Sequence, residues 1–330
     1  MSVLLTHIDD DGKCAAAIAY REMFTINERP EDTLFYNYQD EPILPEYEFL
    51  EKEKVVITDL SINDRIMDFV KRAFEAGCEV YHVDHHATTI VKSNSFTEEE
   101  KAIYDKVHTF FSAKFSATML MWIWACANAE ERADINTIWE KIDFTEVNSH
   151  IGFNPEKPNE RVYRIPDVVR FIDDWDLWKF EHPETKPFHY GFEMELAKMA
   201  NSPLWDELLY NFNAPIIVTK RYLDPGRAIE GYLQSEYAML RRQAFDATIP
   251  GFEDLTCIAI NGLSNSFAFG ELIEQYDVCV LFHFDGTTKD WKYSIYSKDG
   301  GVDVSEIAKA FGGGGHEHAS GFRTQILIFA

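Results

Sequence analysis

The sequence predicts an α/β protein with a larger N-terminal domain built on a parallel sheet and a smaller C-terminal α/β domain. Three observations lead to this prediction. Apolar runs alternate with helical patterns along residues 1–92. Short strands dominate from residue 255 onward. The chain has 330 residues, more than one ordinary domain of roughly 100–200 residues holds.

The charge of the chain limits its partners. It carries 56 acidic and 31 basic residues, for a net charge of −25. Such a chain repels long duplex nucleic acid and anionic membrane surfaces. If it handles phosphates, we expect small substrates and recruited cations. The alternative, that acidity serves only solubility, stays open.

Cysteine usage and hydropathy predict a soluble, cytoplasmic protein. The five cysteines are odd in number and contain no Cys-x-x-Cys pair, which is typical of reduced intracellular residues. No basic leader precedes the apolar residues Val3–Leu5, so we expect no signal peptide. The longest apolar run, 117–129, has about 13 residues and is too short to span a bilayer.

The first expected strand, Val3–Thr6, is followed at once by polar residues. His7 and the three acids Asp9 to Asp11 precede a helix over 13–23 that is rich in alanine. One helix cap uses one acid, so this stretch exceeds what capping explains. Carboxylate and imidazole together predict a metal site.

Two further buried strands end in the same chemistry. Val55–Thr58 is followed by Asp59, and a strand from Val80 is followed by Asp84, His85 and His86. Another strand is expected at Thr33–Tyr38 and an amphipathic helix at 63–76. Parallel sheets bind ligands at the carboxyl ends of their strands. Carboxylates gathered there repel one another, and a divalent cation removes that repulsion.

The middle of the chain is expected to be mostly helical from 93 to 140, with a mixed connector over 141–164. A helix over 166–178 then carries the acids Asp173, Asp174 and Asp176 among tryptophans. Taken alone, this cluster is more typical of a helix end than of a ligand set.

The C-terminal part predicts short strands at 256–260, 278–284, 292–297 and 322–328. A helix over 303–311 is followed by Gly312-Gly313-Gly314-Gly315-His316. Such a backbone can approach an anion closely, although a flexible turn explains the glycines as well.

In this order, the motifs resemble those of the DHH phosphoesterase superfamily with its DHHA1-like C-terminal domain. They are His7-x-Asp9-x-Asp11-Gly12, Asp59, Asp84-His85-His86, the acids 173–176 and Gly312–His316. Members include RecJ-like exonucleases, nanoRNA and pAp phosphatases, cyclic-dinucleotide phosphodiesterases and family II pyrophosphatases. The resemblance implies a catalytic domain at 1–190, a helical linker at 191–245, a substrate-binding domain at 246–330, and an active site in the cleft between the domains.

The resemblance also implies a centre of two divalent ions, with Mn²⁺ the first choice and Mg²⁺ the second. One ion would be held by His7, Asp9 and Asp59, and the other by Asp11, Asp59, His85 and a fourth acid. We choose Asp174 for that acid, with Asp176 as the fallback. The sequence itself does not discriminate among the three acids of the cluster.

Substrate contacts follow from the same resemblance. Asp84 would orient the histidines, and His86 would contact the scissile phosphate. The far end of the substrate would be held by Gly313, Gly314, Gly315, His316, Ser297 and Tyr296. Tyr296 stands where the family often has arginine, so a bidentate phosphate clamp is lost. We expect it to stack on a base instead.

The predicted function is metal-dependent hydrolysis of phosphoester bonds in short oligonucleotides or small nucleotides, with two ions activating a water. One alternative is a protein that sequesters a nucleotide without cleaving it. The others are a pyrophosphatase and a purely structural metal site. The sequence leaves open the oligomeric state, including a homo-oligomer.

Overall fold

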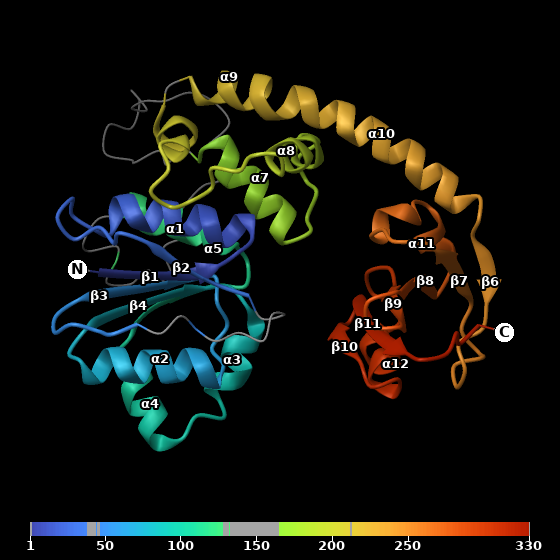
Figure 1. Cartoon of the computed structure of the whole chain (residues 1–330), viewed down its shortest axis with the longest axis horizontal. Helices are drawn as coiled ribbons and strands as arrows, with labels where there is room; N and C mark the ends of the chain where they lie inside the picture. The colour runs from blue at the N-terminus through green and yellow to red at the C-terminus, as the bar shows by residue number, and fades with distance from the viewer. Residues whose placement is uncertain are drawn as a thin grey trace, which may run out of the picture. The chain divides into compact units, whose positions relative to one another are not determined.

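The computed structural model describes residues 2–37, 44, 47–127, 132, 165–211 and 213–329 (Figure 1). By internal contacts the chain forms two compact units, Met1–Ile229 and Glu230–Ala330. Each unit contains one sheet. The connector expected at 141–164 and most of the helical run expected beyond residue 127 lie outside the described residues.

The sheet of the first unit confirms the predicted parallel α/β architecture. Its strand order is β2-β1-β3-β4-β5, and every neighbouring pair is parallel. The strands are β1 (Ser2–His7), β2 (Thr33–Tyr36), β3 (Lys54–Thr58), β4 (Glu79–Asp84) and β5 (His108–Phe111). The expectation of a mostly helical 93–140 was wrong at β5. This edge strand has four residues, too few for a periodic pattern, and its pairing with β4 forms it.

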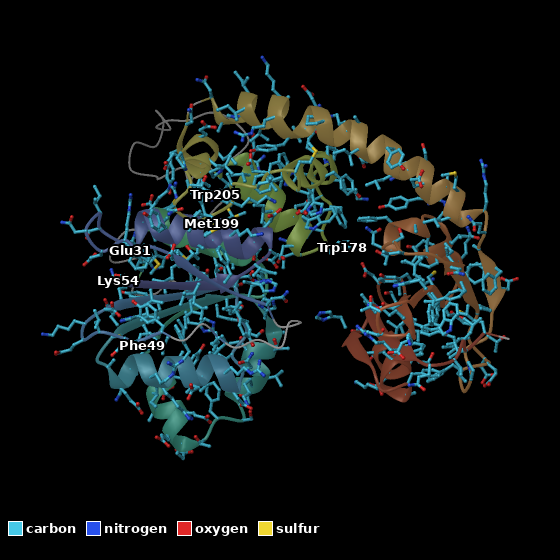
Figure 2. The ribbon with its side chains drawn as sticks, in the orientation of Figure 1. Glu31, Phe49, Lys54, Trp178, Met199 and Trp205 are labelled. Carbon is cyan, nitrogen blue, oxygen red and sulfur yellow. The ribbon has the colours of Figure 1, made fainter. Side chains whose placement is uncertain are left out.

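Helices cover both faces of this sheet (Figure 1). One face carries α1 (Asp10–Glu22), α5 (Ala117–Cys126), α7 (Asp167–Asp176) and α8 (Thr185–Phe192), and the other carries α2 (Asp64–Glu75) and α4 (Glu98–Tyr104). A short helix, α3 (Ala87–Ser93), follows β4. Figure 2 shows Trp205 and Met199 on the α1 side and Phe49 on the α2 side. The two faces therefore have separate hydrophobic cores.

The start of α1 lies tightly against the end of β1. A Cβ atom on Gly12 would lie 2.5 Å from the carbonyl oxygen of His7, so only glycine fits there. The buried Thr6 hydroxyl donates to Gly12 O at 2.8 Å, and Thr58 donates to the Thr6 hydroxyl at 2.9 Å. These bonds hold β1, β3 and α1 together where their polar residues emerge.

The first unit continues past residue 190. Residues beyond that point form a π-helical turn (Asp206–Tyr210), α9 (Ala214–Val218), a second π-helical turn (Thr219–Leu223) and the start of α10 (Asp224–Arg241), which continues into the second unit. Trp205, Leu208 and Tyr222 are buried in the same core as α1. Residues 191–229 thus pack on the first unit, where the sequence had suggested a linker.

The second unit has a mixed sheet in the order β10-β11-β9-β8-β7-β6, of which only β7 and β8 pair in parallel. The strands are β6 (Phe245–Ala247), β7 (Cys257–Asn261), β8 (Val278–Asp285), β9 (Asp290–Tyr296), β10 (Gly314–His316) and β11 (Ala319–Thr324). Its helices are α11 (Leu272–Gln275) and α12 (Val304–Ala310).

Two expectations for the second unit need correction. The last strand is Ala319–Thr324 and not 322–328, because its register on β9 is set by pairs from Ala319 to Thr324. The glycine loop ends in the edge strand β10 rather than in a free loop. A Cβ on Gly313 would lie 2.1 Å from Gly321 O, so close packing against β11 explains that glycine.

Across the described residues, no helix combines the length and the apolar character needed to cross a bilayer.

Candidate metal centre

The predicted metal ligands emerge from adjacent strands. β1 pairs with β3, β3 pairs with β4, and the chain crosses to the opposite face of the sheet between β1 and β3. Ligands of such sheets bind at this reversal, outside the carboxyl ends of the strands. Asp59 stands directly after β3 with φ +57°, a conformation that non-glycine residues adopt rarely and often at functional sites.

Two groups of donor atoms meet here. In the first, His7 Nδ1 lies 2.6 Å from Asp9 Oδ2 and 3.7 Å from Asp59 Oδ2. In the second, His85 Nε2 lies 3.7 Å from Asp11 Oδ2 and 3.4 Å from Asp176 Oδ2. His85 Nε2 is also 3.2 Å from Asp59 Oδ1.

The candidate ligand atoms of His7, Asp9 and Asp59 lie within 4.8 Å of one another, and so do those of Asp11, His85 and Asp176. Those of Asp59, His85 and His86 form a third such set. Asp59 therefore contacts both groups, one through each carboxylate oxygen. We refer to the six residues His7, Asp9, Asp11, Asp59, His85 and Asp176 as the metal cluster.

The metal cluster contains buried polar atoms that the fold leaves unpaired. Asp59 Oδ2, His85 Nε2 and Asp176 Oδ2 accept or donate no hydrogen bond within the described residues. Burial, followed by repulsion from Asp11 and Asp9, raises the pKa of Asp59 and of Asp176 well above the usual range. Unpaired buried carboxylates are costly, and a cation would remove the cost. Oxygen and imidazole donors without thiolate fit Mn²⁺ or Mg²⁺.

The remaining residues of the metal cluster also suit a divalent cation. Burial would raise the pKa of Asp9, but its hydrogen bond with His7 and the charge of His7 lower it to about 2. Burial lowers the pKa of His85, so its imidazole is neutral, as a metal ligand must be. Asp11 accepts from the backbone N–H groups of Ala117 and Thr118, both at 2.8 Å, which fixes its carboxylate against the start of α5.

The three acids of α7 have different surroundings. Asp173 accepts from Ser116 N at 2.7 Å and from Lys179 Nζ at 3.0 Å. Asp174 accepts from Glu181 N at 2.9 Å, from His182 N at 3.2 Å and from the Thr185 hydroxyl. Both acids therefore have partners within the protein.

Asp176 is the acid of this helix that joins the metal cluster. Our first choice, Asp174, is absent from every candidate ligand group of the described residues, because its two oxygens bind the segment that leads into α8. The geometry therefore favours the fallback, Asp176, over Asp174, and metal binding by either acid stays a prediction.

Asp84 orients one of the two histidines that follow it. Burial would raise the pKa of Asp84, but hydrogen bonding with His86 lowers it to about 2, so its carboxylate only accepts. His86 Nδ1–H therefore donates to Asp84 Oδ1 at 2.7 Å, and the Thr89 hydroxyl donates to Oδ2 at 2.5 Å. This leaves His86 Nε2 for another partner. The expected orienting contact is present for His86, while His85 contacts the acids of the cluster.

Sequence reasoning missed the residues that hold Asp59 in place. His82 is buried, and its Nε2–H donates to Leu60 O at 2.8 Å while its Nδ1 accepts from the Tyr104 hydroxyl at 2.7 Å. Asp59 N donates to Val83 O at 2.9 Å. The only sequence signal was a histidine inside an apolar strand, which most often means a satisfied core residue.

The predicted substrate-binding residues of the second unit form a group of their own. The buried Ser297 hydroxyl donates to Val302 O at 2.6 Å and accepts from His318 Nδ1–H at 2.9 Å, so it orients His318. Tyr296 is partly buried and contacts Phe269, with ring centroids 6.2 Å apart. Residues 313–316 are exposed. Substrate contact by Gly313, Gly314, Gly315, His316, Tyr296 and Ser297 stays a prediction.

No family model matches the sequence. One curated relative, the uncharacterized protein R106 of Acanthamoeba polyphaga mimivirus, is 28% identical over 181 residues. The aligned part is 51% of this chain and 38% of that protein, so the chain spans well under half of its relative.

Solved structures resemble the chain over nearly all of its length. The pGpG-specific phosphodiesterase PggH of Vibrio cholerae is 13% identical with a TM-score of 0.50, covering 99% of this chain and 94% of that one. The exonuclease RecJ bound to manganese is 15% identical with a TM-score of 0.48, covering 97% of this chain and 84% of that one. The first comparison establishes a shared fold, in agreement with the fold that the motifs implied.

Proposed function

We propose that this chain, which has the fold of the DHH phosphoesterases, is a metal-dependent phosphoesterase that acts on short oligonucleotides or small nucleotides. One observation carries the proposal. Three buried polar atoms, Asp59 Oδ2, His85 Nε2 and Asp176 Oδ2, converge without a hydrogen-bond partner among the described residues, in a cluster where burial and repulsion disfavour ionised carboxylates.

Two divalent ions, Mn²⁺ or Mg²⁺, would be held by the metal cluster. His7, Asp9 and Asp59 would bind one, and Asp11, Asp59, His85 and Asp176 the other, with Asp59 shared. Bound there, the ions would supply Lewis-acid activation of a water and of the phosphate ester. The two oxygens of Asp59 support this assignment, because one lies 3.7 Å from His7 Nδ1 and the other lies 3.2 Å from His85 Nε2.

His86 would bind the scissile phosphate. Burial would lower its pKa, but the hydrogen bond and charge of Asp84 raise it above the usual value. A protonated His86 donates Nδ1–H to Asp84 and keeps Nε2–H for a phosphoryl oxygen or for the leaving group. Asp84 and Thr89 would keep that ring in one orientation.

The second unit would hold the far end of the substrate. Gly313 to Gly315, His316 and Tyr296 are assigned this role by their resemblance to the family motif. The hydrogen-bonded pair of Ser297 and His318 supports a preorganised surface beside them. The net charge of −25 favours small substrates over long nucleic acid. The five cysteines of the chain form no disulfide, which agrees with a location in the reducing cytoplasm.

The test uses the full chain stripped of metal with a chelator and then reloaded with Mn²⁺. We expect it to release mononucleotides from dinucleotides, and the Asp176→Asn variant to lose this activity. No turnover of dinucleotides, of pAp or of bis(p-nitrophenyl) phosphate by metal-loaded protein would refute the proposal. Tight binding of an intact dinucleotide would instead indicate sequestration, and faster cleavage of pyrophosphate would indicate a pyrophosphatase.

A further inference from the structure

A cavity of about 360 Å³ opens beside the metal cluster in the first unit. Asp9, Asp11 and Asp176 belong both to the cluster and to the lining of this cavity. Small-molecule pockets measure roughly 300–1,000 Å³, so this one is sized for one ring system and its immediate substituents. A molecule in the cavity would touch any phosphate held by the cluster.

The cavity has apolar and aromatic walls. They are formed by Ile8, Phe171, Ile172, Trp175 and Phe188. The Trp175 indole stacks on the His189 imidazole, with ring centroids 3.5 Å and planes 11° apart. Burial lowers the pKa of His189 to about 4, so the ring is neutral at pH 7. These walls suit an uncharged planar group.

A third metal ion does not fit here. Donor atoms of Asp10, His189 and Glu193 lie within 4.8 Å of one another, as a cation site requires. However, Lys198 Nζ lies 2.7 Å from Asp10 Oδ1 and 3.8 Å from Glu193 Oε1, and its side chain is only 7% exposed. The lysine ammonium already supplies the positive charge at this position.

A phosphate does not fit either. Besides the proposed metal ligands Asp9, Asp11 and Asp176, the lining contains the carboxylates of Asp10 and Glu193 and the single ammonium of Lys13. An anion in the cavity would be repelled wherever metal ions do not contact it. The part of a nucleotide that can occupy the cavity is therefore its neutral, planar group.

Resting on the proposed phosphoesterase function, we propose that this cavity binds the nucleobase of the nucleotide whose phosphate reaches the metal cluster. Glu193, which is exposed at the end of α8, accepts from base N–H groups, and Lys13 donates to a ring carbonyl. Guanine places N1–H and an amino group side by side next to its O6, so it matches a carboxylate and an ammonium together. The other common bases lack two adjacent N–H groups, and the cavity therefore prefers guanine.

The test compares Glu193→Gln with the matched control Glu99→Gln, which removes the same charge from an exposed turn of α4. Substrates are GpG, ApA and the base-free bis(p-nitrophenyl) phosphate, with Mn²⁺-loaded protein. Loss of a charge-assisted hydrogen bond predicts that Glu193→Gln raises KM for GpG about tenfold, with kcat unchanged. Hydrolysis of the base-free ester stays at the wild-type level, and Glu99→Gln behaves as wild type throughout.

A second variant and a binding measurement complete the test. Lys13→Gln is expected to remove the preference for GpG over ApA. Equal KM values for GpG in Glu193→Gln and wild type, with the base-free ester still cleaved, would overturn the nucleobase cavity and leave the phosphoesterase standing. If wild type cleaves nothing, the phosphoesterase fails, and calorimetry decides the cavity separately. Guanosine monophosphate must then bind more tightly than adenosine monophosphate and more weakly to Glu193→Gln, and equal affinities would refute the cavity.

Discussion

Two regions of the first unit bury carboxylates, and they differ in whether the protein supplies hydrogen-bond donors to the carboxylate oxygens. In the last turn of α7, the carboxylates of Asp173 and Asp174 accept from backbone N–H groups, a hydroxyl or a lysine. In the metal cluster, one oxygen each of Asp59 and Asp176 has no partner among the described residues. The fold neutralises the first pair itself, which indicates that the second pair is left for a ligand.

Asp174 and Asp176 show how small the cause of this difference is. They are the same residue type, two positions apart on one helix. Each residue turns an α-helix by about 100°, so the two side chains leave it on different sides. One reaches the start of α8 and the other reaches His85.

The largest effect is expected for a substitution in the metal cluster, and it is a loss of turnover. Asp59→Asn removes the carboxylate that contacts both ligand groups, so dinucleotide turnover should fall at least about 1,000-fold, or about 4 kcal/mol of barrier. The metal-free variant should unfold at a higher denaturant concentration than metal-free wild type, because an uncharged amide avoids the burial and the repulsion from Asp11 and Asp9 that disfavour the ionised Asp59 carboxylate. The control Asp105→Asn makes the same change on an exposed site. Wild-type turnover by Asp59→Asn would break the comparison.

The opposite result is expected for the structural acid. Asp174→Asn leaves the N–H groups of Glu181 and His182 and the Thr185 hydroxyl poorly paired, which should lower the unfolding free energy by about 3 kcal/mol. Urea denaturation measures this loss, and Mn²⁺ titration of the folded variant should give the wild-type affinity. A variant with normal stability and lost Mn²⁺ binding would return Asp174 to the ligand set.

Metal addition should separate the two regions directly. Mn²⁺ at 100 times its dissociation constant should stabilise wild type by about 2.7 kcal/mol for each ion bound, measured by denaturation with and without chelator. In Asp176→Asn the same Mn²⁺ concentration should give a much smaller gain, because one ligand is missing. An equal gain in both proteins would place the ion elsewhere.

His189 tests a histidine that the fold keeps neutral, mainly by burial and also through the charge of Lys198. Its pKa is lowered from 6.5 to about 4, so the unfolded chain binds more protons between these values and wild type loses stability as the pH falls through this window. Relative to His189→Gln, we expect a loss of about 2 kcal/mol between pH 6.5 and 4, and a constant difference above pH 7. Parallel stability curves for the two proteins would mean that His189 titrates normally.

The smallest effect is expected for the hydrogen bond between Tyr104 and His82, the histidine that donates to Leu60 O next to Asp59. Tyr104→Phe removes the hydroxyl that donates to His82 Nδ1, which should lower stability by about 1 kcal/mol. Mn²⁺ affinity should stay at the wild-type level, because His82 Nε2 still donates to Leu60 O. A large loss of Mn²⁺ affinity would show that the hydroxyl itself sets the position of Asp59.

Much of the first unit could be predicted from residue order. Apolar runs ending in His7, Asp59 and Asp84 predicted strands whose ends meet, and the parallel sheet does bring these residues to one edge. The short strands were harder. β5 has four residues, and the last strand takes its register from β9, so neither is set by local periodicity.

The sequence by itself determined the fold class and the kinds of donor atom, because apolar alternation and residue type are local properties of the chain. Only the tertiary structure decided that Asp176 rather than Asp174 joins the cluster, that His82 supports Leu60, and that a cavity lies between α1, α7 and α8. Each of these depends on which side of a helix or strand meets a neighbour distant in sequence. That is decided by packing, which joins residues more than 100 positions apart, such as Asp11 and Ala117.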